Sequence, residues 1–329
     1  MIISFNTHYG GLDTSTGYGY AGFNIVQSLQ ALGHTVPFAD PNAPVMLNFT
    51  MPYYYIVADG QYTIGYTPWE STKMQDGWEM IMNQCDEVWT TSDLIAEWFA
   101  ADGVTKPIHV YEHGIEHVWT PRRRRKTGPL KFLHVGEPAT RKGGQLVVDA
   151  FVDLFKNNPD YSLTIKANGF NTTRVRYGDG MLFRPDEASN NIKIITENID
   201  LEQMVHLYHE HDVLLYPSWG EGFGFIPIQG MASGMPVIFN HKWAPYRKYS
   251  VGLDIADQLV PVPHENEGEH PGMIFWPSLD SLKENMLEVA SCFQDYADDA
   301  YEKAPLIHEE YDWVEVTRRA FDHVTKKFS

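Results

Sequence analysis

The stretch Ser218-Trp-Gly-Glu-Gly-Phe-Gly-Phe-Ile-Pro-Ile-Gln229 places three glycines at alternating positions directly before a helix-forming segment. It follows the apolar run 213–216, which is typical of a buried strand, and Gly234 and Pro236 close the helix. Glycine lets backbone N–H groups approach a ligand closely, and a helix N-terminus carries a partial positive charge. The order of strand, glycine turn and helix therefore predicts a phosphate-binding site. The alternative is a strand-to-helix turn whose glycines are only structural.

Polar side chains in the same stretch are candidate ligands for the rest of such a molecule. Glu221, at the tip of the turn, is an acceptor suited to sugar hydroxyls. Gln229 lies two helical turns further on and is expected to reach a ribose from the same face. We assign the backbone of Gly222, Phe223 and Gly224 to the phosphates.

The segments on either side of this stretch alternate between strand and helix patterns. The first half shows strands at 2–5, 35–38, 62–66, 87–90 and 108–111, with helices at 21–32, 77–83 and 93–101. The second half shows strands at 130–135, 162–166, 192–195, 213–216 and 237–239, with helices at 145–157 and 201–209. This alternation predicts an α/β protein with two doubly wound, mostly parallel sheets. Ligands bind at the carboxyl ends of such strands, so both sets of ends are expected to face a central cleft.

The domain boundaries follow from the proline-flanked, charged segment 119–129, which is not expected to pack in a core. We predict an N-terminal domain over 1–121, a linker over 122–129 and a C-terminal domain over 130–304. A final helix over 305–329 has no partner that the pattern indicates, and a return to the N-terminal domain is one option.

Composition narrows the function classes. The 329 residues suit two α/β domains, and the formal net charge of -18 is a poor match for a protein that coats nucleic acid. Cys85 and Cys292 are far apart, without metal or redox spacing, and are expected to be reduced. The N-terminus has no signal-peptide pattern, and no run approaches the roughly 20 apolar residues of a membrane span. We therefore expect a cytoplasmic protein.

A basic pair opens the second half, within Phe132-Leu-His-Val-Gly-Glu-Pro-Ala-Thr-Arg-Lys-Gly-Gly144. A strand, a glycine turn and then Arg141 and Lys142 at the start of a helix form a plausible diphosphate clamp. Arginine forks onto phosphate oxygens, whereas lysine acts as a point charge. By itself such a pair also fits a solvated helix start.

These two stretches resemble the signature of the retaining glycosyltransferases of family 4, which have the GT-B architecture of two Rossmann-like domains. Glu221 matches the first acid of that signature, whereas Gln229 replaces the second, which typically holds the nucleotide ribose. Lys142 matches the family's lysine, but Glu137 occupies the position that is usually arginine, so Arg141 is assigned as a possible substitute. The resemblance covers nearly the whole chain and is most specific at 213–239.

The N-terminal half resembles the same family less specifically. Gly10 and Gly11 match its first glycine loop, which implies a place near the donor phosphates and the acceptor. Tyr66-Thr-Pro-Trp-Glu70-Ser resembles a subset with a Trp-Glu pair after the central strand. Two interpretations of Glu70 remain open: it orients or deprotonates an acceptor hydroxyl, or it is a charge at the start of a following helix.

The resemblance implies transfer of a sugar from a nucleoside diphosphate to a hydroxyl acceptor, with retention. Glu221, Lys142 and Glu70 are the assigned catalytic residues, no cofactor is expected, and the spacing of His8, His134 and His241 supports no metal site. The sugar, the base and the acceptor are not indicated.

Other functions remain as alternatives. Gly17-Tyr-Gly-Tyr-Ala-Gly22 with Asp40 matches the fingerprint of an NAD-dependent oxidoreductase, but it does not follow the first strand directly. A degenerate nucleotide-sugar-binding protein and an epimerase are also consistent with the residues. The basic run Arg122–Arg125 allows a nucleic-acid contact, with a modified base in DNA as acceptor, although a solvated linker is favoured.

Overall fold

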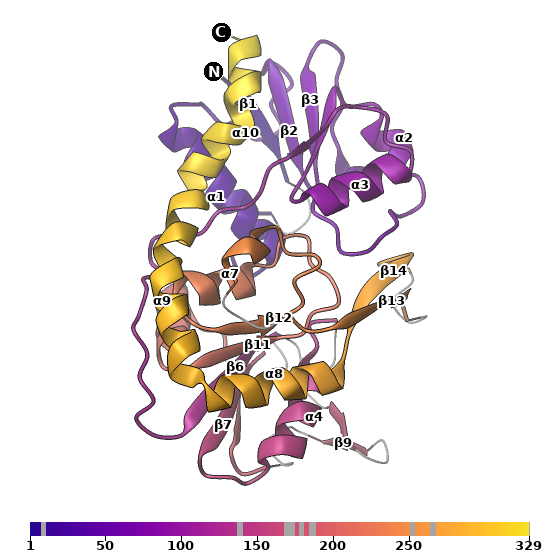
Figure 1. Ribbon diagram of the computed structural model, residues 1–329. Coiled ribbons are helices and arrows are strands. Elements are labelled where there is room, and N and C mark those ends of the chain that lie inside the picture. Colours follow the sequence, from indigo (N-terminus) through magenta and orange to yellow (C-terminus); the bar gives the residue numbers. More distant parts are fainter. Residues whose placement is uncertain are drawn as a thin grey trace.

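The structure is a computed structural model, and it describes residues 1–7, 11–136, 141–167, 175–177, 181–183, 189–250, 254–263 and 268–328. Two five-stranded sheets form two α/β bodies, one above the other in Figure 1. This confirms the predicted fold class of two Rossmann-like domains.

The N-terminal sheet has the order β1-β2-β3-β4-β5, and all of its strand pairs are parallel. Its strands are β1 (Ile3–Asn6), β2 (Val45–Phe49), β3 (Tyr62–Tyr66), β4 (Glu87–Thr90) and β5 (Ile108–Val110). The sequence analysis expected its second strand at 35–38 and did not predict β2. Residues 35–38 instead form single bridges with the outer edge of β1, through Thr35 and Phe38. Pro37 lacks an N–H group, which confines this segment to an edge.

Local capping explains where the main helices of this half begin. Thr16 accepts a hydrogen bond from the Gly19 N–H group at the start of α1 (Gly17–Ala31), and Ser92 caps α3 (Asp93–Ala101) in the same way. The shorter helices are η1 (Pro52–Tyr54) and α2 (Trp78–Met82). About ten residues separate β1 from α1, so the 17–22 glycines do not form the tight turn of a dinucleotide site.

The C-terminal sheet has the order β10-β7-β6-β11-β12, again with parallel pairs. Its strands are β6 (Leu130–Val135), β7 (Tyr161–Lys166), β10 (Ile192–Ile195), β11 (Val213–Tyr216) and β12 (Val237–Phe239). Its helices include α4 (Gly144–Phe155), α6 (Leu201–His209), α7 (Phe225–Ala232) and α8 (Leu279–Ser291). The direction of strand order reverses between β6 and β11, and that is where doubly wound sheets bind ligands.

Two antiparallel hairpins were not predicted. One joins β8 (Val175–Tyr177) to β9 (Met181–Phe183), and the other joins β13 (Asp257–Pro261) to β14 (Met273–Pro277). The tip of the second hairpin bonds to the N-terminal domain. The Thr72 N–H group donates to the Met273 carbonyl at 3.0 Å, and Ser71 Oγ donates to the Pro271 carbonyl at 2.8 Å.

The last two helices, α9 (Phe293–Glu310) and α10 (Trp313–Lys327), run along one side of both domains in Figure 1. The helical segment thus starts earlier than the expected 305, and Pro305 lies inside α9. Helix α10 contributes Trp313, Phe321 and Val324 to the N-terminal core. The Tyr111 and Thr317 hydroxyls, 206 positions apart, are 2.6 Å from each other.

The connecting segment is more buried than expected. Trp119 is fully buried and Arg124 is only 4% exposed, so the expectation that this charged segment stays outside a core is wrong for these residues. Arg124 donates to the carbonyls of Arg122, Tyr208, His211 and Ser233. The carbonyls of Tyr208, His211 and Ser233 lie at the C-terminal ends of α6 and α7, where a cation is favourable.

Among the described residues, we find no helix with the length and apolar character required to cross a bilayer.

Candidate active site at the meeting of the two sheets

The carboxyl ends of strands from both domains meet at one cluster of charged side chains. Arg141 and Lys142 follow β6, Glu221 follows β11, and Glu70 follows β3 of the other domain. Lys142 Nζ lies 2.7 Å from both Glu221 carboxylate oxygens, and Arg141 Nη1 lies 3.0 Å from Oε1. The structure therefore brings the three assigned catalytic residues and Arg141 together.

Glu221 is the centre of this cluster and is 7% exposed. Its Oε1 also accepts hydrogen bonds from the hydroxyls of Tyr216, at 2.8 Å, and Ser218, at 2.6 Å. Burial by itself would raise the pKa of the Glu221 carboxyl, but the charges of Arg141 and Lys142 outweigh it and lower the pKa to about 2. Glu221 is therefore a fixed anion at neutral pH.

Arg141 connects the two domains. Its Nη2 lies 3.1 Å from Glu70 Oε1, and its Nη1 donates to the Gly220 carbonyl at 2.6 Å. No helix begins at 71–77, since α2 starts only at Trp78, so the interpretation of Glu70 as a helix N-terminal charge is wrong. His270 Nδ1 lies 3.8 Å from the other oxygen of Glu70.

The two cations and the two carboxylates balance each other in charge. Burial, followed by the adjacent Arg141 charge, lowers the pKa of Lys142 below its ordinary value despite the opposing effect of Glu221. An anionic ligand that enters this cluster competes with Glu221 for the two cations, because Glu221 pairs with both.

The glycines of the turn allow a close approach of the N-terminal domain. A Cβ atom added at Gly220 would lie 2.2 Å from the Glu70 carbonyl oxygen, and one at Gly222 would lie 2.4 Å from Pro68 Cβ. Thr91 Oγ1 donates to the Gly222 carbonyl. Gly224 has a φ of 84° and packs against Trp243, so its backbone also favours glycine.

Two helix N-termini face this edge of the sheet. Helices α4 and α7 follow the neighbouring strands β6 and β11, and their N-cap residues are the left-handed glycines Gly143 and Gly224. Within the part of the chain that the structure describes, no side chain caps either helix. The positive ends of both helix dipoles therefore lie at the switch point, where they favour an anion.

The remaining assigned residues differ in their surroundings. Gln229 is 6% exposed, and its Oε1 lies 3.4 Å from the Tyr208 hydroxyl. The Phe223 ring is buried beside His113 and Tyr246. Gly11 lies in the loop after β1 with a φ of 53°, and Gly10 lies outside the described residues.

Sequence reasoning did not identify the two hydroxyls on Glu221 or the contact between the β13–β14 hairpin and residues 71–72. Tyr216 and Ser218 lie close to Glu221 in the sequence, but this closeness does not indicate that they bond to it. Only the fold directs both hydroxyls to the same carboxylate oxygen. The pairing of Glu70 with Arg141 spans 71 positions and has no local signal.

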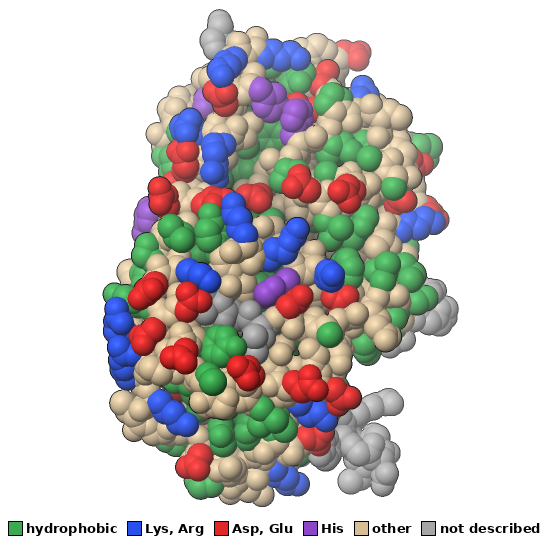
Figure 2. Space-filling model, viewed as in Figure 1, with side chains coloured by type: hydrophobic (Ala, Val, Ile, Leu, Met, Phe, Trp, Pro, Cys, Tyr) green, Lys and Arg blue, Asp and Glu red, His purple; other side chains and the backbone are tan. Residues whose placement is uncertain are grey.

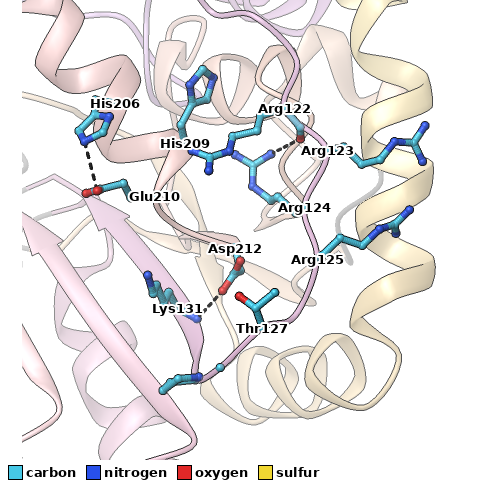
Figure 3. A pocket seen from close by; sticks show the side chains of 12 residues that line it. Arg122, Arg123, Arg124, Arg125, Thr127, Lys131, His206, His209, Glu210 and Asp212 are labelled. Carbon is cyan, nitrogen blue, oxygen red and sulfur yellow. Dashed lines mark hydrogen bonds and ion pairs between the residues drawn. The ribbon is translucent and has the colours of Figure 1, made fainter.

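The basic run forms part of a pocket of about 490 Å³ beside α6, whose lining includes none of the residues of the Glu221 cluster (Figure 3). Three of its arginines already have partners within the protein. Arg124 is buried and bonded to carbonyls, and Arg123 and Arg125 both form ion pairs with Asp298. Acidic side chains also line it, with His206 Nε2 3.1 Å from Glu210. Positive and negative side chains are likewise interspersed on the face shown in Figure 2.

About half of this chain is similar in sequence to known glycosyltransferases. A family described as "Family 4 Glycosyltransferase in conflict systems" matches residues 84–243. Glycogen synthase of Mycobacterium tuberculosis is 28% identical over 153 residues, 45% of this chain and 34% of the relative. D-inositol 3-phosphate glycosyltransferase of Corynebacterium aurimucosum is 27% identical over 173 residues, 48% of this chain and 39% of the relative. The chain thus spans well under half the length of these curated relatives.

Solved structures match over the whole chain. Sucrose-phosphate synthase from Thermosynechococcus elongatus has a TM-score of 0.69 at 13% identity, with 100% of this chain and 99% of that chain covered. Anabaena HepE in complex with UDP-glucose has a TM-score of 0.66 at 12% identity, with 99% and 100% covered. The fold is that of the GT-B glycosyltransferases. The matching family and the curated relatives are glycosyltransferases, so the chain is similar to glycosyltransferases of family 4 in sequence and shares the GT-B fold.

Proposed function

We propose that this protein transfers a sugar from a nucleoside-diphosphate sugar to a hydroxyl acceptor. The observation that carries the proposal is the convergence of Lys142, Arg141 and Glu221 at the switch point of the C-terminal sheet, below two helix N-termini without side-chain caps. The similar HepE structure holds UDP-glucose, and the similar pneumococcal transferase GtfA holds UDP and GlcNAc, which supports a nucleotide-sugar donor.

The proposed chemistry follows from the charges of the cluster. Negative charge develops on the diphosphate as the bond to the sugar breaks. Lys142, Arg141 and the N–H groups at the start of α7 stabilise it, so the reaction needs no metal ion. Glu221, an anion with a pKa of about 2, accepts hydrogen bonds from donor hydroxyls once the diphosphate has taken its place on the cations.

The roles of the N-terminal domain are part of the same proposal. Glu70 holds Arg141 across the domain interface and orients the acceptor hydroxyl beside it. Gly11 lies in the loop that follows β1, at the carboxyl edge of the N-terminal sheet, and Gly10 and Gly11 are assigned to the donor phosphates and the acceptor. Gln229 takes the place of the family's second acid near the ribose, as a neutral hydrogen-bonding group.

We propose retention at the anomeric carbon, which the resemblance to the family supports, and a cytoplasmic location, which the buried free thiol of Cys85 fits. The anomeric proton coupling of the isolated product, measured by NMR, distinguishes retention from inversion.

The test is a panel of nucleotide sugars, with release of nucleoside diphosphate as the readout. Wild-type protein should hydrolyse or transfer from at least one donor. Lys142→Ala should lower kcat/KM about 100-fold, which corresponds to about 2.7 kcal/mol of lost charge stabilisation. Lys303→Ala is the matched control, because Lys303 forms an exposed pair with Asp299 in α9. Equal activity of the Lys142→Ala and control proteins would refute the phosphate assignment.

A further inference from the structure

A cluster of two histidines and one buried glutamate lies at the opposite edge of the N-terminal sheet from the proposed donor site. Glu87 is the first residue of β4, whereas the donor cluster follows the last residues of the strands. The potential ligand atoms of Glu87, His109 and His323 all lie within 4.8 Å of one another.

Three different elements supply this cluster. Glu87 and Trp89 lie on the same face of β4, His109 pairs in register with Trp89 from β5, and His323 comes from α10. Trp89 packs edge-on against Phe321 of α10, with ring centroids 4.8 Å apart. The cluster therefore joins the last helix to the sheet, and Figure 2 shows histidine side chains gathered near α10.

The geometry resembles that of ligands around one ion. The Nε2 atoms of His109 and His323 each lie 3.0 Å from the same Glu87 oxygen, Oε2. Ligand atoms of a tetrahedral zinc site are about 3.3 Å apart when each lies about 2.0 Å from the metal. The two imidazole rings lie side by side, with centroids 4.7 Å apart and an angle of 26° between their planes.

Burial and access also fit a metal site. The Glu87 side chain is 3% exposed, so its carboxylate requires partners, and both histidine side chains are more than 40% exposed. An ion has a path from solvent, and water is available as a fourth ligand. Two imidazoles and one carboxylate favour Zn²⁺ and neighbouring transition metals over Mg²⁺ or Ca²⁺.

We propose that Glu87, His109 and His323 bind one divalent transition-metal ion, with Zn²⁺ as the preferred ion. The metal fastens α10 to the N-terminal sheet and takes no part in sugar transfer, since the site lies at the other edge of that sheet. The proposal is independent of the proposed function.

Isothermal titration with ZnCl₂ tests the proposal on the full chain after removal of any affinity tag and treatment with a chelator. Wild-type protein should bind one equivalent and show a higher Tm with zinc, whereas MgCl₂ should produce neither effect. His323→Ala should weaken zinc binding by at least about 100-fold and remove the Tm shift. His109→Ala should also weaken zinc binding and remove the Tm shift. It serves as the second variant if His323→Ala does not fold.

His117→Ala is the matched control, because His117 Nε2 lies 3.0 Å from Asp312 and the described residues add no third ligand to this pair. Its zinc affinity should equal that of the wild type. The proposal is wrong if wild-type protein binds no zinc at sub-millimolar concentration. It is also wrong if both ligand variants bind as tightly as His117→Ala.

Discussion

Replacing Glu221 by Gln should destabilise the folded protein in a pH-dependent way. The carboxylate accepts from Lys142 and Arg141 and from two hydroxyls, and its pKa is lowered to about 2 from an ordinary value near 4.3. Each pKa unit corresponds to about 1.4 kcal/mol, so ionised Glu221 contributes about 3 kcal/mol at pH 7. The amide keeps an acceptor for the hydroxyls but removes the negative charge that pairs with both cations.

The sign of the pH effect follows from the lowered pKa. A carboxyl whose pKa is lower in the folded state stabilises the protein above its unfolded pKa, and this contribution is lost as pH falls toward the folded pKa. The difference in free energy of unfolding between wild type and Glu221→Gln should thus fall from about 3 kcal/mol at pH 7 to about 1.5 kcal/mol at pH 3.

Urea denaturation followed by circular dichroism measures this difference. Glu315→Gln is the control, because Glu315 forms an exposed i,i+3 pair with Arg318 in α10, and its loss should cost less than about 0.5 kcal/mol. A Glu221→Gln difference that stays constant between pH 7 and pH 3 would refute the charge argument.

Three further predictions concern packing and reactivity. Arg124→Ala should lower the free energy of unfolding by about 3 kcal/mol, because buried carbonyls lose their donor. The control Arg123→Ala should lower it by less than about 1 kcal/mol. Urea denaturation measures both changes. Gly224→Ala should lower the Tm, since its φ is positive and the added Cβ would lie 2.5 Å from a Trp ring atom. Iodoacetamide at pH 8 should label the exposed Cys292 and spare Cys85, whose pKa burial raises to about 12; mass spectrometry of peptides identifies the modified thiol.

The local sequence pattern predicted most strands correctly. It failed where pairing with a neighbouring strand determines whether a segment is a strand of the sheet. The apolar runs that form β3, β4, β6, β10, β11 and β12 have the predicted bounds. The misassigned strand at 35–38 and the missed β2 both lie next to β1, and only the pairing shows which of them is the main neighbour. Hairpin β13–β14 was missed, and its contacts with 71–72 join segments about 200 positions apart, which no local pattern indicates.

The same distinction applies to the candidate site. The rule that ligands bind at the carboxyl ends of parallel strands correctly predicted that Lys142 and Glu221 would lie near each other, since they follow neighbouring strands. It did not predict that Glu70 would pair with Arg141, because that contact depends on how the two domains meet. The Glu87 cluster also depends on α10, whose partner the sequence pattern did not reveal.

The path of α10 has a consequence for biosynthesis. Trp313, Phe321 and Val324 fill a core whose members between Ile3 and Tyr111 were synthesised at least about 200 residues earlier. At about 5–20 residues per second, the ribosome needs on the order of 10–40 s to make that interval. The first half of the nascent chain therefore waits with an unfilled apolar surface while the second half emerges and folds, and it reaches its native state last.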